Sequence, residues 1–210
     1  MKISHKNLEE LLNTISHGIA AIASVLGFIV LLNASTNDQI LLFSTIVYGM
    51  SLITLYTSST LYHSSKNKKH REIFRILDHC SIFILIAGTY TPIALISING
   101  ATGWWIFAIQ WSLVIIGSIY KFFFTGKYEK ISLLIYIIMG WMIIFKWNVL
   151  INTISTSALN LLLLGGIIYT TGIIFYVLDS KMKYSHFIWH LFVITGSTLH
   201  YIMIFKYVIN

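Results

Sequence analysis

Long apolar intervals that contain no charged residue alternate with short polar clusters along the whole chain. The uncharged intervals run from Leu11 to Asn37, Gln39 to Ser65, His79 to Tyr120, Ile131 to Phe145, Trp147 to Leu178 and Tyr184 to Phe205. A helix needs about 20 apolar residues to cross a bilayer. Each interval therefore predicts one membrane span, except the longest, which must hold two spans separated by the turn-forming segment 99–103.

The chain is expected to be an all-α integral membrane protein, a bundle of seven transmembrane helices in a single domain over residues 1–210. The predicted spans are 12–32, 40–63, 76–98, 103–124, 131–150, 158–178 and 185–207. The fifth span extends past Lys146 because the uncharged interval before this residue is short. We expect the lysine side chain to snorkel toward the membrane interface.

Composition and charge agree with a membrane location. Hydrophobic residues make up 57% of the chain and charged residues only 10%, against roughly 25% charged residues in soluble domains. Basic residues gather on one side of the predicted bundle, namely Lys2, Lys6, Lys66, Lys68, Lys69, Arg71, Arg75, Lys121, Lys127, Lys130, Lys181 and Lys183. Because the opposite side has only Lys146 and Lys206, the N-terminus is predicted to be cytoplasmic and the C-terminus external. The net charge of +7 follows from this topology, so no nucleic-acid partner is expected.

Four ionisable residues fall at one predicted depth near the cytoplasmic face. His63 ends the second span, Asp78 opens the third, and His186 and His190 open the seventh. The last two lie four positions apart, which places both imidazoles on one face of a helix. With His63 they offer three ligands to one ion and leave a fourth position for water, as in catalytic zinc sites. The pattern predicts that these three histidines bind Zn²⁺.

Asp78 and Ser59 are the candidate catalytic residues beside this ion. An acid inside a membrane span is costly unless it has a partner. For Asp78 the partner is either a metal-bound water or one of two nearby cations, Arg71 and Arg75. Ser59 lies one helical turn before His63 and therefore faces the same side of its helix.

Two further histidines are expected to lie outside the metal site. His79 is rotated by about 100° from Asp78 around the helix, so we expect only one of these two side chains to point into the site. His200 lies about 21 Å beyond His186 along its helix and is expected to line a cavity or to pack. A single histidine near an interface is usually a solvated side chain. The joint occurrence of several at one depth is what favours a metal site.

Four stretches carry polar residues at fixed spacing within or beside apolar runs: "EELLNTISHG", "SSTLYHS", "LDHCSIFILIAGTYTP" and "HFIWHLFVITGSTLHYI". The first contains Glu10, Asn13 and His17 in the pattern E-x2-N-x3-H. Together these stretches resemble the signature blocks of the bacterial hemolysin III family, part of the superfamily that includes the progestin and adiponectin receptors.

The resemblance implies seven helices, a cytoplasmic N-terminus and a zinc ion bound by three histidines. Carried over position by position, the ligands are His63, His186 and His190, with Ser59 and Asp78 beside the metal. The ligand-binding role of the animal receptors is not carried over, because a family shares its fold and site more reliably than its activity.

Three functions suit such a site. The leading hypothesis is a zinc-dependent intramembrane hydrolase of a lipid amide or ester, similar to a ceramidase. In it Asp78 accepts the proton of a water, and Ser59 donates a hydrogen bond to that water or to the oxyanion. The alternatives are a pore-forming cytolytic protein and a zinc-stabilised membrane sensor without catalysis. The expected partner is a membrane lipid, as substrate or ligand, and the expected location is the bacterial plasma membrane. The oligomeric state stays open.

Overall fold

A computed structural model describes residues 5–35 and 38–209, and helices account for nearly all of them. The elements are α1 His5–Ala34, α2 Gln39–Ser64, α3 Lys68–Pro92, η1 Ile93–Ile98, α4 Gly100–Phe124, α5 Glu129–Trp141, η2 Met142–Lys146, α6 Trp147–Thr153, α7 Thr156–Val177, α8 Ser185–Ile204 and η3 Phe205–Ile209. They form 7 spans that are long and apolar enough to cross a membrane, and the described ranges contain no strand. The prediction of an all-α seven-helix membrane protein is confirmed.

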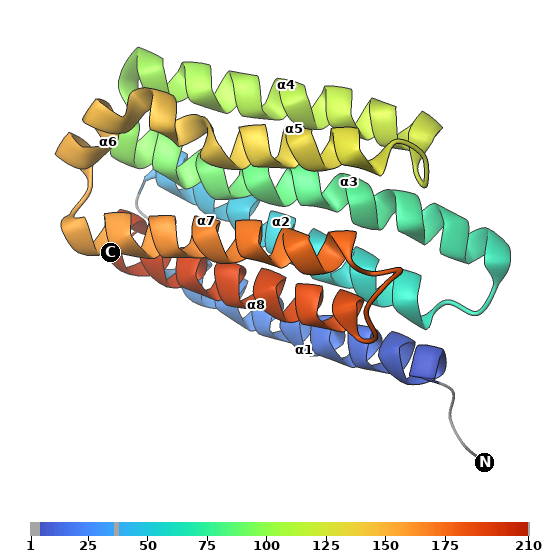
Figure 1. The fold of residues 1–210 in the computed structure, drawn as a ribbon. Helices are drawn as coiled ribbons and strands as arrows, with labels where there is room; N and C mark the ends of the chain where they lie inside the picture. Colours follow the sequence, from blue (N-terminus) through green and yellow to red (C-terminus); the bar gives the residue numbers. More distant parts are fainter. Residues whose placement is uncertain (1–4, 36–37, 210) are drawn as a thin grey trace.

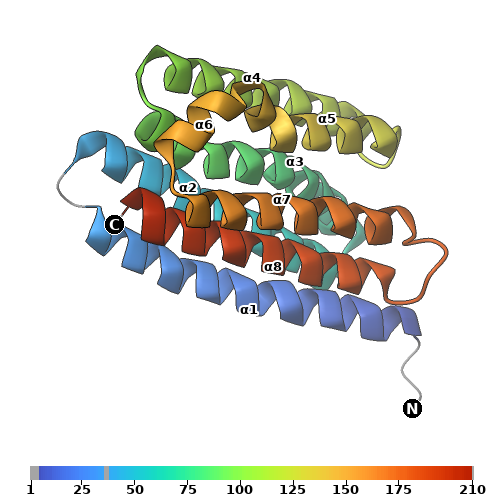
Figure 2. The ribbon, with the colours of Figure 1, turned by 60° about the vertical axis from the view of Figure 1, so that its left-hand side comes forward.

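The spans run alongside one another, and the start of α1 and the end of η3 lie at opposite ends of the bundle (Figure 1). α1 packs against both α2 and α8, and α8 also packs against α7 (Figure 2). α4 and α5 lie beyond α3, on the side away from α1 (Figures 1 and 2). Because α1 contacts both α2 and α8, the second and last spans meet in one region although they are far apart in the sequence.

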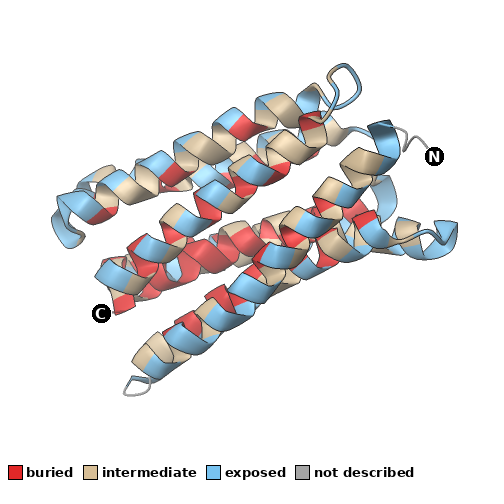
Figure 3. Ribbon diagram, turned by 90° about the horizontal axis from the view of Figure 1, so that it is seen from below, coloured by how far each residue is buried: buried red, intermediate tan, exposed pale blue. Residues whose placement is uncertain are grey.

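Apolar side chains cover the outside of the bundle, while many polar side chains are buried within it. Ile19 is 64% exposed, Trp105 70% and Phe145 83%, as expected for positions that face acyl chains. Figure 3 shows the buried residues along the inward faces of the helices. Small residues allow close contact between spans: a Cβ at Gly88 of α3 would lie 2.2 Å from Ser51 Oγ of α2.

The fifth span, predicted over 131–150, is interrupted. α5 ends at Trp141, a short 3-10 segment follows, and α6 completes the crossing. Neighbouring spans satisfy the backbone groups near this break: Tyr90 OH donates to Gly140 O at 2.8 Å and accepts from Ile143 N–H at 3.0 Å. Such partners are what allow irregular backbone at membrane depth.

Candidate metal centre

Two helices present the predicted ligands at the same end of the bundle. His63 lies one residue before α2 ends at Ser64, and His186 and His190 occupy the first two turns of α8. The ligand atoms of the three imidazoles lie within 4.8 Å of one another. His63 and His190 are buried, and His186 is half-buried. The structure therefore brings all three predicted ligands together.

Contacts with α1 and α7 fix the position of the start of α8. They thereby fix how far along the bundle its two histidines lie. Tyr184 has a left-handed φ of 58° and ends the loop that leads from α7. Ser185 Oγ donates a 2.6 Å hydrogen bond to Phe175 O of α7. Glu9 Oε1 of α1 accepts a hydrogen bond from His186 N–H at 3.3 Å. This partner satisfies one of the free N–H groups of the helix start.

A divalent metal ion fits the group of imidazoles. His63 Nε2 and His190 Nδ1 are buried and have no hydrogen-bond partner among the described residues, and leaving such an atom unsatisfied costs about 1–3 kcal/mol. A bound cation would satisfy both atoms. Zinc–nitrogen bonds measure about 2.0–2.1 Å, so two nitrogens on one ion are at most about 4.2 Å apart. The three ligand atoms, all within 4.8 Å of one another, lie close to that spacing.

Two of the imidazoles also contact carboxylates. Glu10 Oε2 of α1 accepts a 2.8 Å hydrogen bond from His63 Nδ1, and its other oxygen pairs with Arg71 of α3. In the α7–α8 loop, Asp179 Oδ2 lies 3.6 Å from His186 Nδ1. Interaction with the His186 ring lowers the pKa of the Asp179 carboxyl, although partial burial acts in the opposite direction.

The two predicted catalytic residues lie beside the imidazoles but are not part of their group. Ser59 is 1% exposed, and its Oγ has no hydrogen-bond partner in the described part of the chain. Asp78 is half-buried, and no ion pair joins it to Arg71 or Arg75 among the described residues. Its carboxylate is also absent from the cluster of possible ligand atoms around His63. Both side chains line the same cavity as the α8 histidines.

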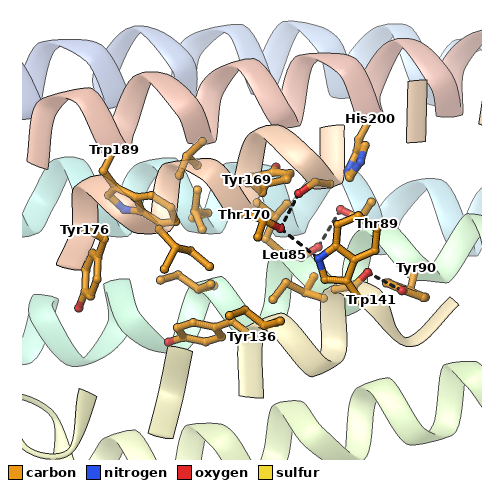
Figure 4. Close-up of a pocket in the computed structure, with 18 of the residues that line it drawn as sticks. Leu85, Thr89, Tyr90, Tyr136, Trp141, Tyr169, Thr170, Tyr176, Trp189 and His200 are labelled. Carbon is orange, nitrogen blue, oxygen red and sulfur yellow. Dashed lines mark hydrogen bonds between the residues drawn. The ribbon is translucent and has the colours of Figure 1, made fainter. Parts of the chain in front are cut away.

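This cavity has a volume of about 150 Å³ and extends from the imidazoles into the bundle. Figure 4 shows Tyr176 and Trp189 toward one end and His200 and Tyr90 toward the other, with Leu85 between them. The walls between the two ends are mainly apolar. The cavity therefore connects the polar site, at the end of the bundle that carries most of the basic residues, with an apolar interior.

The structure shows where the two histidines lie that were expected to be outside the metal site, His200 and His79. His200 lines the cavity, as predicted, and its Nε2 lies 3.0 Å from Leu162 O of α7. Asp78 and His79 both line the cavity, but His79 is not in the group of possible ligands, and its Nδ1 lies 3.6 Å from Glu129 Oε2 of α5. The cavity extends over several spans. Side chains from a wide arc of α3 can therefore line it, whereas only one side of that helix could face a single ion.

Sequence reasoning did not place the residues that α1 contributes. The His17 ring stacks on the His190 ring with centroids 3.6 Å apart and planes 9° apart, and it also lines the cavity. Both of its ring nitrogens are buried without a partner. The available signal was the spacing of Glu10, Asn13 and His17, which lie three and four residues apart and so share one helix face.

Comparison with known proteins extends over nearly the whole chain. A family profile described as "Haemolysin-III related" matches residues 5–201. Hemolysin-3 of Bacillus cereus is 44% identical over 205 residues, which are 96% of this chain and 92% of that protein. The Hemolysin-3 homolog of Bacillus subtilis (strain 168) is 38% identical over 204 residues, 96% and 95% of the two chains. Monocyte to macrophage differentiation factor of Homo sapiens is 29% identical over 205 residues, 95% and 84% of the two chains.

Proposed function

The chain belongs to the haemolysin III family, and we propose that it is a zinc-dependent hydrolase that cleaves a lipid amide or ester inside the membrane. The observation that carries the proposal is the proximity of three imidazoles, whose ligand atoms lie within 4.8 Å of one another, where His186 and His190 line a cavity whose walls are mostly apolar. We place the protein in the bacterial plasma membrane, with the basic end of the bundle in the cytoplasm.

The metal would be held by His63, His186 and His190. Imidazole nitrogens suit zinc, and three protein ligands leave a position open for chemistry. When bound, zinc supplies Lewis acidity, which polarises a carbonyl and lowers the pKa of a water molecule toward about 7.

Asp78 is the proposed general base and acid. Its carboxylate lines the cavity, and no ion pair occupies it among the described residues. It would accept a proton as the water oxygen forms its bond to the carbonyl carbon. It would then return the proton to the leaving nitrogen or oxygen as the amide or ester bond breaks.

Ser59 is the proposed hydrogen-bond donor to the reacting oxygen. Its hydroxyl is buried and makes no hydrogen bond to any residue that the structure describes, so its proton would be free for a substrate. A donor aimed at the developing oxyanion stabilises the transition state. The apolar walls beyond it, such as Leu85 and Val193, would hold an acyl chain.

A zinc-stabilised sensor without catalysis is the second candidate. It is favoured by the location of the three imidazoles on two different spans, because an ion shared between α2 and α8 would tie them together whether or not it reacts. A pore is less well supported, since a conducting path needs a polar lining and the walls of this cavity are mostly apolar.

The test uses full-length protein purified in lipid nanodiscs, loaded with zinc, and offered ceramide-like amides, lipid esters and phospholipids. We expect turnover of at least one class by the wild-type protein, none by Asp78→Ala or His190→Ala, and wild-type turnover by Glu72→Ala. Glu72 is an exposed acid on the same helix as Asp78 and serves as the matched control. Turnover that survives Asp78→Ala, or no turnover of any class, would refute the hydrolase. Zinc binding without turnover would favour the sensor.

A further inference from the structure

α1 supplies no predicted metal ligand, yet it reaches two of the three ligands. Glu10 Oε2 accepts a hydrogen bond from His63 Nδ1 at 2.8 Å. One residue earlier, Glu9 accepts a hydrogen bond from the backbone N–H of His186. The first two turns of α1 therefore contact both α2 and α8, at the point where each presents an imidazole to the cluster.

The Glu10 contact decides which nitrogen of His63 faces the cluster. A carboxylate only accepts hydrogen bonds, so the proton of this pair belongs to Nδ1 of the imidazole. In a neutral ring the other nitrogen, Nε2, then carries the free lone pair. That Nε2 atom is the buried one without a partner. The hydrogen bond thus leaves His63 in the tautomer that can bind a metal through Nε2.

The position of the Glu10 carboxylate is itself fixed by Arg71. The Arg71 guanidinium pairs with Oε1 of Glu10, while His63 occupies Oε2. The same guanidinium donates to Tyr62 O at 3.2 Å and lies 4.5 Å from the centre of the Tyr62 ring. Since Tyr62 precedes His63 on α2, the arginine connects the carboxylate to the helix that carries the ligand. Arg71 therefore favours the orientation of Glu10 in which its other oxygen meets His63.

We propose that Glu10 is a positioning residue of the metal centre. By accepting the Nδ1 proton of His63 it sets the tautomer and the ring orientation that present Nε2 to the ion, and Arg71 holds the carboxylate in place. This inference rests on the proposed metal binding. Carboxylates in this relation to a ligating histidine orient the ring and raise its basicity, and their loss typically costs 10–100-fold in metal affinity.

The first experiment measures Zn²⁺ affinity by competition with a chelating dye, using the full-length protein in nanodiscs. We expect Glu10→Ala to weaken binding about 10–100-fold. We expect Glu10→Gln to weaken it less, because an amide oxygen still accepts the Nδ1 proton. Glu72→Gln removes one negative charge from an exposed side chain near the start of α3, outside the cluster, and should bind zinc as the wild-type protein does. The melting temperature of the metal-free variants serves as the check on folding.

The second experiment separates positioning from a general loss of charge or structure. If Glu10 acts through His63, Glu10→Ala should cause no further loss of affinity in a His63→Ala background. The same change should keep its effect in a His186→Ala background. An equal loss in both backgrounds, or wild-type affinity in Glu10→Ala, would overturn the positioning role and leave the metal site intact. A wild-type protein that binds no metal would overturn the proposed function together with this inference.

Discussion

At the scale of single residues, two adjacent serines on α2 show how differently buried hydroxyls are used. Ser58 Oγ donates to Leu55 O at 3.0 Å and also contacts Ser81 Oγ of α3 at 3.1 Å. Ser59 Oγ has no partner although the residue is 1% exposed. A buried hydroxyl without a partner is a cost to the folded protein. In the proposed function, substrate or water would supply the missing partner.

Replacing each serine by alanine should therefore have opposite consequences. Ser59→Ala should leave the free energy of unfolding unchanged or slightly higher, because it removes an unsatisfied group, and should lower kcat by about 10²–10³-fold as for a lost oxyanion donor. Ser58→Ala should lower stability by about 1 kcal/mol for the lost hydrogen bonds and change kcat little. Ser59→Thr, which keeps the hydroxyl, should retain part of the activity.

The measurements are steady-state hydrolysis and thermal unfolding of the metal-loaded variants. A wild-type kcat for the Ser59→Ala variant would contradict a catalytic role for Ser59.

At the scale of elements, the close approach of α4 to the end of the third span depends on one glycine. Asn99 and Gly100, both with positive φ, form the turn between these spans. A Cβ added at Gly103 would lie 2.0 Å from Ala94 O, a backbone atom that cannot rotate away. Position 103, in the first turn of α4, therefore requires a residue without a side chain.

We expect Gly103→Ala to destabilise the protein by about 1–3 kcal/mol through overpacking. Gly140→Ala is the matched control, since no atom would lie within 4 Å of the added Cβ. Because alanine favours a helix by about 0.5–1 kcal/mol over glycine, this control should be neutral or stabilising. Thermal unfolding in detergent measures both variants. Equal melting temperatures would show that η1 and α4 can separate without cost.

At the scale of the whole molecule, the candidate metal centre joins residues of spans that are distant in the sequence. His63 comes from α2, while the other two ligands come from α8. The ion pairs of Glu10 add α1 and α3 to the same end of the bundle. An ion bound here would therefore stabilise the association of the first three spans with the last.

Removal of the metal should lower the melting temperature of the protein. Ligand that binds only the folded state, at 1,000 times its Kd, stabilises by about 4 kcal/mol, so a strong chelator should shift the transition by several degrees. The His190→Ala variant should melt near the temperature of the metal-free wild-type protein, and its melting temperature should change little with chelator or added zinc. A melting temperature that does not depend on chelator would contradict a metal shared between the spans.

Much of the fold and part of the candidate site could be predicted before the structure. The uncharged intervals imply seven spans, because the bilayer imposes a minimum length on each helix. The four-residue spacing of His186 and His190 implies a shared face, because an α-helix turns once in 3.6 residues. The depth of His63 then follows from the side of the membrane on which the second span ends.

Other features depended on how neighbouring spans rotate and pack. The contact of Glu10 with His63, and the stacking of His17 on His190, join helices whose relative rotation no local pattern specifies. The interruption of the fifth span is tolerated because Tyr90 of another helix satisfies its backbone groups.

By itself the sequence determined the class of protein, the number of its spans, and the helix face that His186 and His190 share. These properties follow from hydrophobicity and helical periodicity, which act along one segment at a time. Only the tertiary structure decided which faces meet, and hence that α1 contributes Glu10 and His17 to a cluster whose predicted ligands lie on α2 and α8. Helix rotation and spacing are set by the packing of side chains from several spans at once.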